Sequence, residues 1–429
     1  MAPEFVLRPE FYDVDWDKLP EPENIDGLQF TQIQQRNEWI VKLQFEQAGV
    51  TSCGTAFYVN IPEAKYHVIL TAGHNLVDST RKRSKNLRIL SSVGEAKIEQ
   101  KLLKIFVSAS YEKNPSQSNA ENDYGAILIS KERSGFGPRG FGFSLKLGHD
   151  NLHGQEMNVS GYRVASEPGQ PHESTGVCIR CGENQLKYDV VTEKGFSGSP
   201  VFIGYKGYET AIAIHNNGRE RHGRGANGSR GSRLNEYVLG EIFSWIDIGY
   251  RSKWLKVSQP KAVHGKGLYL RFPPDEEHGW VRLGHKGLET SFDVIPACAP
   301  TSTMPNSHMN YVFRFNPPRG WPRPKKEKWV LWDVVKQCVY LTSTLQEYCF
   351  PRIIWDKKNT DAFRIVLPDH QITNAQGAMG GLVEFRMQAT EIIEEDIEMG
   401  VVDTPEVSFE KYLKGKKAKF NDFCFKSVK

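Results

Sequence analysis

The sequence predicts a mainly β protein: two six-stranded β-barrels side by side, closed by a C-terminal helix and followed by a second β-rich or α+β domain. Three observations predict this fold class. About ten short strand-like segments lie between Trp39 and His215, separated by Gly, Pro and Asn, as is typical of barrels and sandwiches. Leu234–Ile248 instead places apolar residues at helical spacing. The 429 residues exceed the length of one ordinary domain.

Taken in order, the chain begins with an arm over residues 1–36, which is rich in proline and carboxylates and is expected to be extended. Alternation and β-branched residues then predict the strands, which are Ile40–Phe45, Cys53–Asn60, His67–Thr71, Leu87–Ser91, Leu102–Val107, Gly125–Ile129, Met157–Tyr162, Gly176–Arg180, Leu186–Val190, Pro200–Ile203 and Thr210–His215. The glycine-rich segment 131–150 is the expected crossover between barrels. The first domain therefore spans residues 37–250, and Gly249 is the expected C′ residue of its last helix.

Residues 251–429 are expected to form a C-terminal domain whose role the sequence does not reveal. The segments expected to be strands are Gly267–Phe272, Trp280–Leu283, Tyr311–Phe315, Phe363–Leu367 and Leu382–Met387. A helix is expected over Trp329–Tyr348. This half is a candidate for contact with a regulatory partner.

Composition narrows the class of protein. A net charge of +4 is small for this length, so nucleic acid is not expected as a partner. The sequence has no run of about 18 apolar residues, and its start lacks the basic and apolar regions of a secretory signal, so a cytoplasmic protein without membrane spans is expected. The seven cysteines are odd in number and irregular in spacing. Cys178 and Cys181 have no completing ligand pair, so free thiols, no metal and no cofactor are expected.

Three short motifs indicate nucleophilic catalysis. The turn Gly195-Phe-Ser-Gly-Ser-Pro200 carries Ser197 at its tip, where the N–H groups of Gly195 and Ser197 can hold an oxyanion. A serine hydroxyl needs a base, and the base needs an orienting acid. His74 follows a predicted strand in Thr-Ala-Gly-His, and Asp123 precedes another in Asn-Asp-Tyr-Gly-Ala-Ile-Leu. Each motif alone is explained as easily by an ordinary turn or strand end.

Taken together, the three motifs resemble the catalytic blocks of the chymotrypsin superfamily in order and spacing. The resemblance covers about residues 37–250 and implies a double β-barrel with a triad in the cleft between the barrels. It implies that His74 takes the proton of Ser197 and that Asp123 holds the imidazole. The run Ser-Gly-Ser-Pro-Val-Phe is similar to the glutamyl endopeptidase branch, where asparagine usually stands at the position of Phe196. In trypsin-type zymogens an aspartate there receives the new N-terminal amine, which Phe196 cannot do.

The resemblance also implies where the P1 side chain binds. Val191 and Thr192 correspond to the wall and floor of the S1 pocket, and neither carries a charge. His215, in Ala-Ile-His-Asn-Asn-Gly, is similar to the S1 histidine of glutamyl endopeptidases and of picornavirus-type proteases. A histidine beside a threonine hydroxyl can donate to a carboxylate or an amide. Glu is therefore expected at P1, with Gln or Asp as competitors, although His215 could simply end a strand.

The function expected from these residues is an intracellular serine endopeptidase that acts on proteins or peptides. The alternative is a catalytically silent binding or scaffold protein on a protease fold, because fold does not dictate function. Residues Gly218–Arg233 carry five arginines and are expected to be a solvated loop, or else a basic rim that attracts acidic substrates. The basic runs Arg323–Lys328 and Lys414–Lys419 are expected to be solvated loops as well.

Overall fold

The computed structural model describes residues 37–91, 94–95, 103–131, 140–164, 170–218 and 228–248 in the first part of the chain. Beyond these it describes 251–258, 268–271, 282–284, 291–299, 309–316, 328–333, 338–345, 352–355, 362–368, 382–384, 407–408 and 424–428. The chain divides into two compact units: the first extends to Gly249 and takes in Ala297–Met309, and the second begins at Tyr250. The predicted arm over 1–36 and the predicted C′ residue Gly249 lie outside the described residues.

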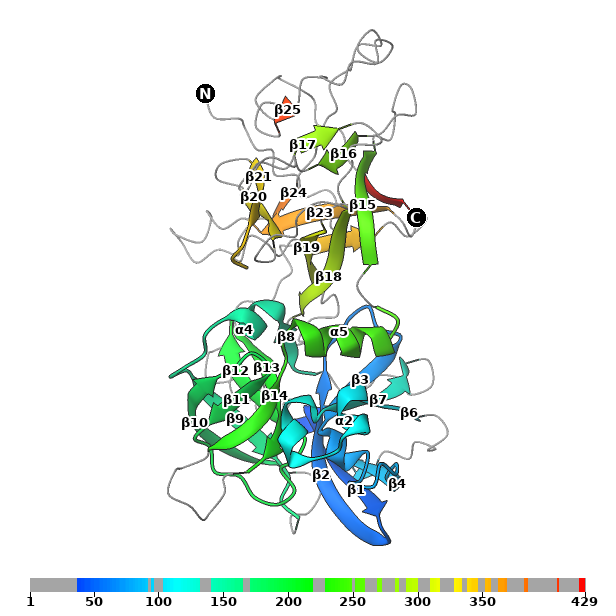
Figure 1. Cartoon of the computed structure of the whole chain (residues 1–429), viewed down its shortest axis with the longest axis vertical. Coiled ribbons are helices and arrows are strands. Elements are labelled where there is room, and N and C mark those ends of the chain that lie inside the picture. The colour runs from blue at the N-terminus through cyan, green and yellow to red at the C-terminus, as the bar shows by residue number, and fades with distance from the viewer. Residues whose placement is uncertain are drawn as a thin grey trace, which may run out of the picture. The chain divides into compact units, whose positions relative to one another are not determined.

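The first sheet is an open half-barrel of seven antiparallel strands in the order β5-β4-β1-β2-β3-β7-β6 (Figure 1, blue to cyan). The strands are β1 (Ile40–Gln47), β2 (Val50–Val59), β3 (Tyr66–Thr71), β4 (Lys85–Ser91), β5 (Gly94–Glu95), β6 (Leu103–Val107) and β7 (Gly125–Ser130). Strands β3 and β7 are buried over most of their length, and Thr71 pairs with Gly125 where β3 ends and β7 begins. The backbone of the residues next to that pair is therefore held in place by the sheet.

Six antiparallel strands close the second barrel. Strand β9 pairs with β10, β10 with β11, β11 with β14, β14 with β13, β13 with β12, and β12 again with β9. They are β9 (Glu156–Gly161), β10 (His172–Cys181), β11 (Gln185–Tyr188), β12 (Pro200–Tyr205), β13 (Tyr208–Asn217) and β14 (Ser229–Arg233). Strand β8 (Gly142–Ser144), followed by helix α4 (Leu145–His149), pairs in parallel with β13. A buried cluster that includes Met157, Val159, Leu186 and Val201 fills the barrel.

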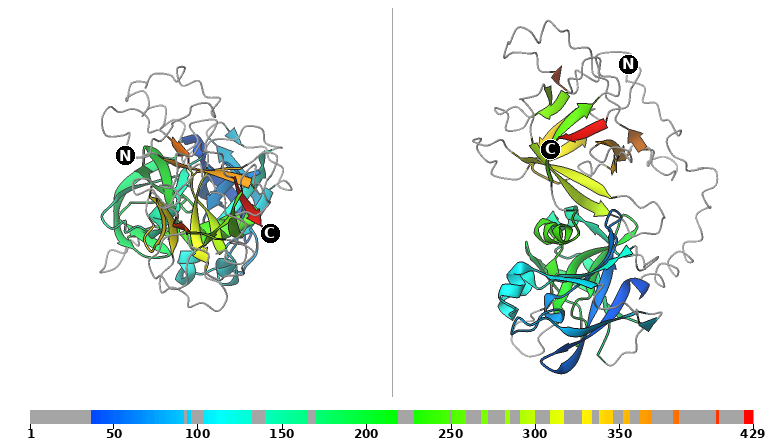
Figure 2. Two further views of the ribbon diagram at one scale, coloured as in Figure 1. Left: turned by 90° about the horizontal axis from the view of Figure 1, so that it is seen from above. Right: turned by 90° about the vertical axis from the view of Figure 1, so that its right-hand side faces the viewer.

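Helix α5 (Glu236–Trp245) closes one end of this unit, as the views of Figure 2 also show. It begins at Asn235, whose side chain accepts a hydrogen bond from the Val238 N–H at 2.9 Å. Trp245 stacks on Phe106 of β6, and Phe243 packs on Phe143 of β8, with ring centroids 5.6 and 5.5 Å apart. The helix thus contacts both sheets, and the predicted mainly β double-barrel fold with a closing helix is confirmed. The first sheet differs in detail, because it is an open half-barrel of seven strands where six were expected.

The second unit contains only strands among its described elements, which fits the β-rich alternative. These are β15 (Arg251–Ser258), β16 (Leu268–Arg271), β17 (Arg282–Gly284), β18 (Ser291–Ala299, whose last three residues belong to the first unit), β19 (Asn310–Asn316), β20 (Trp329–Asp333), β21 (Cys338–Thr342), β22 (Arg352–Trp355), β23 (Ala362–Pro368), β24 (Leu382–Glu384), β25 (Val407–Ser408) and β26 (Cys424–Val428). The helix predicted over Trp329–Tyr348 is wrong, because β20 and β21 form an antiparallel ladder there. Trp329 pairs with Thr342 at one end of the ladder, and Asp333 pairs with Cys338 at the other. Aromatic and β-branched residues there favour strands over a helix.

The arginine-bearing segment near residue 230 also differs from the prediction. Ser229–Arg233 is not a solvated loop but strand β14, paired with β11 and β13. Arg233 is buried, and its guanidinium donates to the carbonyls of Gly182, Leu147 and Asp150. Small polar residues give β14 no local strand signal, so barrel closure decides its conformation. Arg219, Arg221, Arg224 and most of the two basic runs lie outside the described residues.

Among the residues that the structure describes, no helix combines the length and the apolar character needed to cross a bilayer.

Candidate active site

His74 and Asp123 meet because their elements are neighbours in the first sheet. The 3-10 helix Gly73–Asn75 carries His74 just after β3, and the 3-10 helix Gln117–Asn122 ends at Asp123 just before β7. Asp123 accepts two hydrogen bonds, from the His74 backbone N–H at 2.8 Å and from His74 Nδ1 at 2.7 Å. The carboxylate side chain is 4% exposed and the imidazole 34%. Asp123 therefore holds the proton on Nδ1 and leaves Nε2 free to accept one.

Two opposing effects act on the pKa of His74. Burial lowers the pKa because it disfavours the charged imidazolium, whereas the negative charge of Asp123 and its hydrogen bond raise the pKa. The attraction to Asp123 prevails, so the pKa of His74 lies above its ordinary value of 6.5. A histidine with this partner is a stronger base than a free one.

The turn that carries Ser197 is held from both barrels. The Ser197 carbonyl accepts from the Thr55 N–H at 2.8 Å and from Asn75 Nδ2 at 2.9 Å. The next residue, Gly198, has φ +89°, and a Cβ there would lie 2.1 Å from the Thr55 carbonyl oxygen, so only glycine fits. The Ser197 hydroxyl donates to the Asn216 carbonyl over 3.5 Å. That bond is at the limit of hydrogen-bond length, so rotating the hydroxyl elsewhere costs little.

The two N–H groups predicted as oxyanion donors have no acceptor among the described residues. The carbonyl of Lys194 accepts from the Val164 N–H at 3.1 Å, on the side opposite the Gly195 N–H in a trans peptide. The next carbonyl, that of Gly195, accepts from Thr55 Oγ1 at 2.7 Å. Both peptides around Gly195 are thus held, and its φ of +102° requires glycine.

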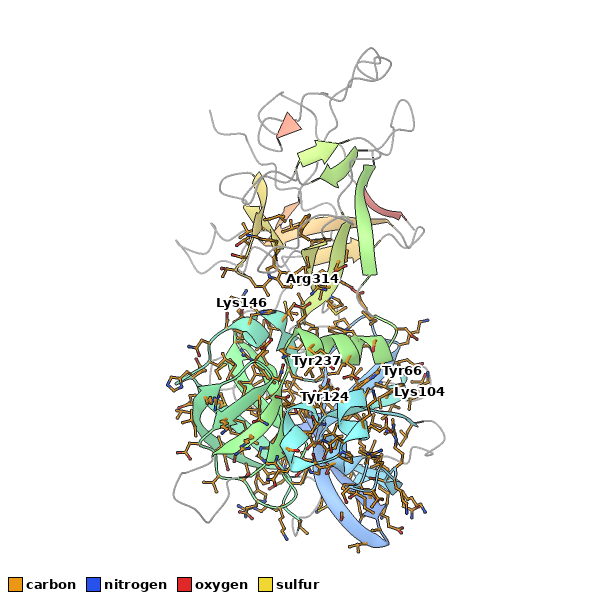
Figure 3. The ribbon with its side chains drawn as sticks, viewed as in Figure 1. Tyr66, Lys104, Tyr124, Lys146, Tyr237 and Arg314 are labelled. Atoms are coloured by element: carbon orange, nitrogen blue, oxygen red, sulfur yellow. The ribbon has the colours of Figure 1, made fainter. Side chains whose placement is uncertain are left out.

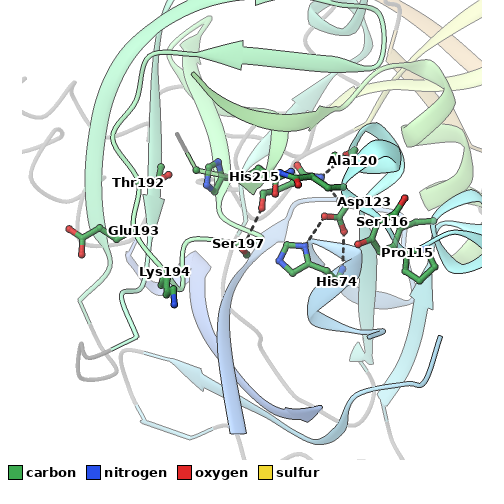
Figure 4. A pocket seen from close by; sticks show the side chains of 15 residues that line it. His74, Pro115, Ser116, Ala120, Asp123, Thr192, Glu193, Lys194, Ser197 and His215 are labelled. Carbon is green, nitrogen blue, oxygen red and sulfur yellow. Dashed lines mark hydrogen bonds and ion pairs between the residues drawn. The ribbon is translucent and has the colours of Figure 1, made fainter. Parts of the chain in front are cut away.

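One cavity of about 940 Å³ brings together the predicted site residues His74, Asp123, Thr192, Ser197 and His215 (Figure 4). It is lined by His74, Tyr111, Pro115, Ser116, Gln117, Ala120, Asp123, Thr192, Glu193, Lys194, Ser197, His215, Asn216, Asn217 and Gly218. All three motifs of the sequence contribute to this lining. Val191, predicted as a wall of the S1 pocket, does not, and this residue is 65% exposed. Gly195, predicted as an oxyanion donor, is not part of the lining either.

No protein-family model and no curated protein sequence matches the chain significantly. Solved structures do show similarity. A thermostable serine protease, AL20, from an extremophilic microorganism is 18% identical over 50% of this chain and 99% of its own, with a TM-score of 0.38. A Glu endopeptidase is 18% identical over 49% and 91%, with a TM-score of 0.37. Tobacco etch virus protease is 14% identical over 54% and 84%, with a TM-score of 0.36. What this site does has to follow from its own geometry.

His215 lies on β13 and lines the cavity together with Thr192 (Figure 4). Its Nδ1 is 2.7 Å from the hydroxyl of Tyr188 on β11, and both side chains are buried. The Tyr188 hydroxyl has no other acceptor among the described residues, so it donates to Nδ1 and leaves the ring proton on Nε2. Burial, and then the charge of His74, lower the pKa of His215 to about 3. His215 is therefore a neutral hydrogen-bond donor at neutral pH.

Sequence reasoning missed Asn216, which ties the serine side of the cavity to the aspartate side. Its Nδ2 donates to the carbonyls of Ala120 and Asp123, both at 2.8 Å, and its Oδ1 accepts from the Ser232 N–H at 2.9 Å. Its own carbonyl is the acceptor for Ser197 Oγ. The available signal was its position directly after His215. Tyr188, 27 residues away in sequence, carried no such signal.

Phe196 points away from the cavity. It is 2% exposed and belongs to the apolar cluster of the second barrel. Packing in this cluster, and not an ion pair, therefore anchors the turn beside Ser197.

The four cysteines whose side chains the structure describes are not among the residues that line the cavity. Cys53, Cys178, Cys181 and Cys298 are free thiols. Burial raises the pKa of Cys178 to about 11, so this thiol stays protonated. Among the described residues, no group of His, Cys, Asp and Glu side chains is placed to hold a metal ion.

Proposed function

We propose that this chain is a serine endopeptidase with Ser197 as nucleophile, His74 as general base and Asp123 as the residue that orients His74. The observation that carries the proposal is that these side chains, from three separate segments, line one cavity. Within it, Asp123 accepts two hydrogen bonds from His74. Neutral His74 with its proton on Nδ1 offers Nε2 as the base that a serine hydroxyl requires.

In this proposal the Ser197 oxygen attacks the scissile carbonyl carbon while its proton passes to His74 Nε2. The carbonyl oxygen becomes an oxyanion and accepts hydrogen bonds from the N–H groups of Gly195 and Ser197. Collapse expels the amine, which takes the proton from His74, and leaves an ester on Ser197. Water then gives a proton to His74 and attacks the ester carbon. Collapse releases the carboxylic acid, and the Ser197 oxygen takes the proton back from His74. Asp123 keeps its hydrogen bond to His74 and stabilises the imidazolium.

The P1 side chain is proposed to enter between Thr192 and His215, where His215 Nε2–H donates to it. A neutral imidazole provides a hydrogen bond without a positive charge. Of the described residues that line the cavity, Lys194 is the only lysine or arginine and is next to Glu193 in the chain, so these residues offer little to offset a buried carboxylate. A Gln amide needs no counter-charge. Gln is therefore proposed ahead of Glu at P1, whereas the sequence alone had placed Glu first.

The test compares the wild type with Ser197→Ala on peptides that have Gln, Glu, Asp or Lys at P1. Ser199→Ala is the matched control, because Ser199 belongs to the same turn but is buried and its hydroxyl has no hydrogen-bond partner among the described residues. We expect Ser197→Ala to lose about 10⁴-fold or more in kcat and Ser199→Ala to retain activity. A fluorophosphonate should label the wild type and Ser199→Ala but not Ser197→Ala.

Equal turnover by the wild type and Ser197→Ala, or no labelling, would contradict the proposal and favour a binding protein on a protease fold. The P1 assignment has its own readout, which is the ratio of kcat/KM for Gln to that for Glu. We expect the ratio to exceed one at pH 7.5 and to fall as the pH approaches the ordinary Glu pKa of about 4.3, where the side chain becomes neutral. A ratio below one at pH 7.5 would show that Glu is preferred.

A further inference from the structure

Lys42 is a buried cation outside the cavity. It lies on β1 in the first sheet and is only 8% exposed, although lysines are seldom buried. Its Nζ donates to the carbonyl of Val164 at 3.0 Å. Val164 follows β9 of the second barrel, so this bond joins the two barrels. A hydrogen bond from an ammonium group is stronger than one between neutral groups.

The same Val164 backbone holds one of the proposed oxyanion donors. Its N–H donates to the Lys194 carbonyl at 3.1 Å, and that peptide carries the Gly195 N–H on its opposite side. Gly195 is packed closely on this segment, since a Cβ there would lie 2.4 Å from the Tyr162 carbonyl oxygen. A continuous path of two hydrogen bonds therefore runs from the Lys42 ammonium to the peptide between Lys194 and Gly195.

We propose that Lys42 is a positioning residue for the oxyanion hole. Its ammonium fixes the Val164 backbone, and Val164 fixes the Lys194–Gly195 peptide with the Gly195 N–H free for the oxyanion. The inference rests on the proposed function of the cavity. Val164 itself is 54% exposed, so its own side chain contributes little burial to hold this segment. Without the ammonium, the peptide rotates more freely and the donor is present for a smaller fraction of the time.

A donor that acts on the oxyanion stabilises the transition state and not the bound substrate. Lys42→Met, which keeps an unbranched side chain one atom shorter and removes the donor, should therefore lower kcat and leave KM within about twofold. Loss of one oxyanion donor costs about 10²–10³-fold in kcat, so we expect a decrease between about 10-fold and that limit. Lys42→Arg, which keeps a cationic donor, should recover most of the rate.

Lys131→Met is the matched control. Lys131 is also partly buried and also donates to backbone carbonyls, those of Ile61 and Pro62 at 3.4 and 3.5 Å, but it does not line the cavity. We expect it to keep the wild-type kcat. A Lys42→Met variant whose kcat matches that of Lys131→Met would overturn the proposal. The proposal would also be overturned if Lys42→Met and Lys42→Arg showed the same decrease in kcat and this decrease paralleled a loss of stability in both.

A second measurement separates this inference from the proposed function. Amide hydrogen exchange of the Val164 N–H, followed by NMR in the full chain, reports its bond to the Lys194 carbonyl whether or not the protein cleaves peptides. We expect exchange at Val164 to be faster in Lys42→Met than in the wild type and unchanged in Lys131→Met. Unchanged exchange in Lys42→Met would overturn the role of Lys42. A wild type without peptidase activity would overturn the proposed function instead.

Discussion

The hydroxyl of Tyr188 offers a sharp test of the P1 assignment. It lies 2.7 Å from His215 Nδ1, and both side chains are buried, with exposures of 0% and 2%. Tyr188→Phe removes one oxygen atom and leaves the ring in the core of the second barrel, so packing is preserved. What changes is that a buried ring nitrogen loses its hydrogen-bond partner.

The magnitude follows from that loss. Leaving one buried polar group unsatisfied costs about 1–3 kcal/mol, and this is the expected decrease in the free energy of unfolding. The variant also no longer fixes the proton on Nε2, because either tautomer then leaves one nitrogen unsatisfied. Binding a Gln side chain then requires His215 to keep its proton on Nε2 without the Tyr188 hydrogen bond, which lowers the affinity for the amide. Each 1.4 kcal/mol lost corresponds to a tenfold lower affinity. We expect kcat/KM for Gln relative to Met at P1 to fall by about tenfold.

The assay is the ratio of kcat/KM for paired peptides with Gln or Met at P1, measured beside urea unfolding. Tyr162→Phe is the matched control, since Tyr162 is fully buried and its hydroxyl donates to the Ile40 carbonyl at 3.3 Å, away from His215. It should lose stability and keep the Gln-to-Met ratio. If Tyr188→Phe loses stability but keeps the wild-type ratio, Tyr188 is only structural and the reasoning about the tautomer is refuted.

Three further predictions concern other parts of the same unit. Because Asp123 holds the pKa of His74 above 6.5, kcat/KM of the wild type should rise with pH with a midpoint above 6.5. Asp123→Asn should move that midpoint to lower pH and reduce kcat by about 10⁴-fold. A midpoint that does not move would contradict the role of Asp123 in raising the pKa of His74. Phe196→Ala should lower the free energy of unfolding by about 3–5 kcal/mol and Phe196→Leu by less than about 1.5, as measured by urea unfolding; equal losses would argue against tight packing. Glu241 on α5 accepts from the Tyr124 hydroxyl below that helix (Figure 3), so Glu241→Gln should cost about 1–2 kcal/mol of unfolding free energy, and no change would show that this bond does not hold the helix.

Much of the first unit could be predicted because its signals are local. Alternation and β-branched residues located eleven of its strands within a few residues, and the apolar spacing of Val238, Leu239, Ile242 and Phe243 located α5. The errors came where local signal was absent or ambiguous. Strand β14 is built from small polar residues and arginines, and its conformation depends on its partners β11 and β13. In the second unit, the apolar residues near Trp329 fit both the 3.6-residue period of a helix and the two-residue period of a strand. Pairing between β20 and β21 decides in favour of strands.

The sequence by itself determined which residues could form the site. The three motifs around His74, Asp123 and Ser197 combine a nucleophile, a base and an acid with the turn residues that each position needs, and these requirements are local. Only the tertiary structure decided what surrounds them. The bonds from Tyr188 to His215 and from Lys42 to Val164 join residues 27 and 122 positions apart. Such pairs depend on the closure of the second barrel and on its packing against the first sheet, which no periodicity in one segment encodes.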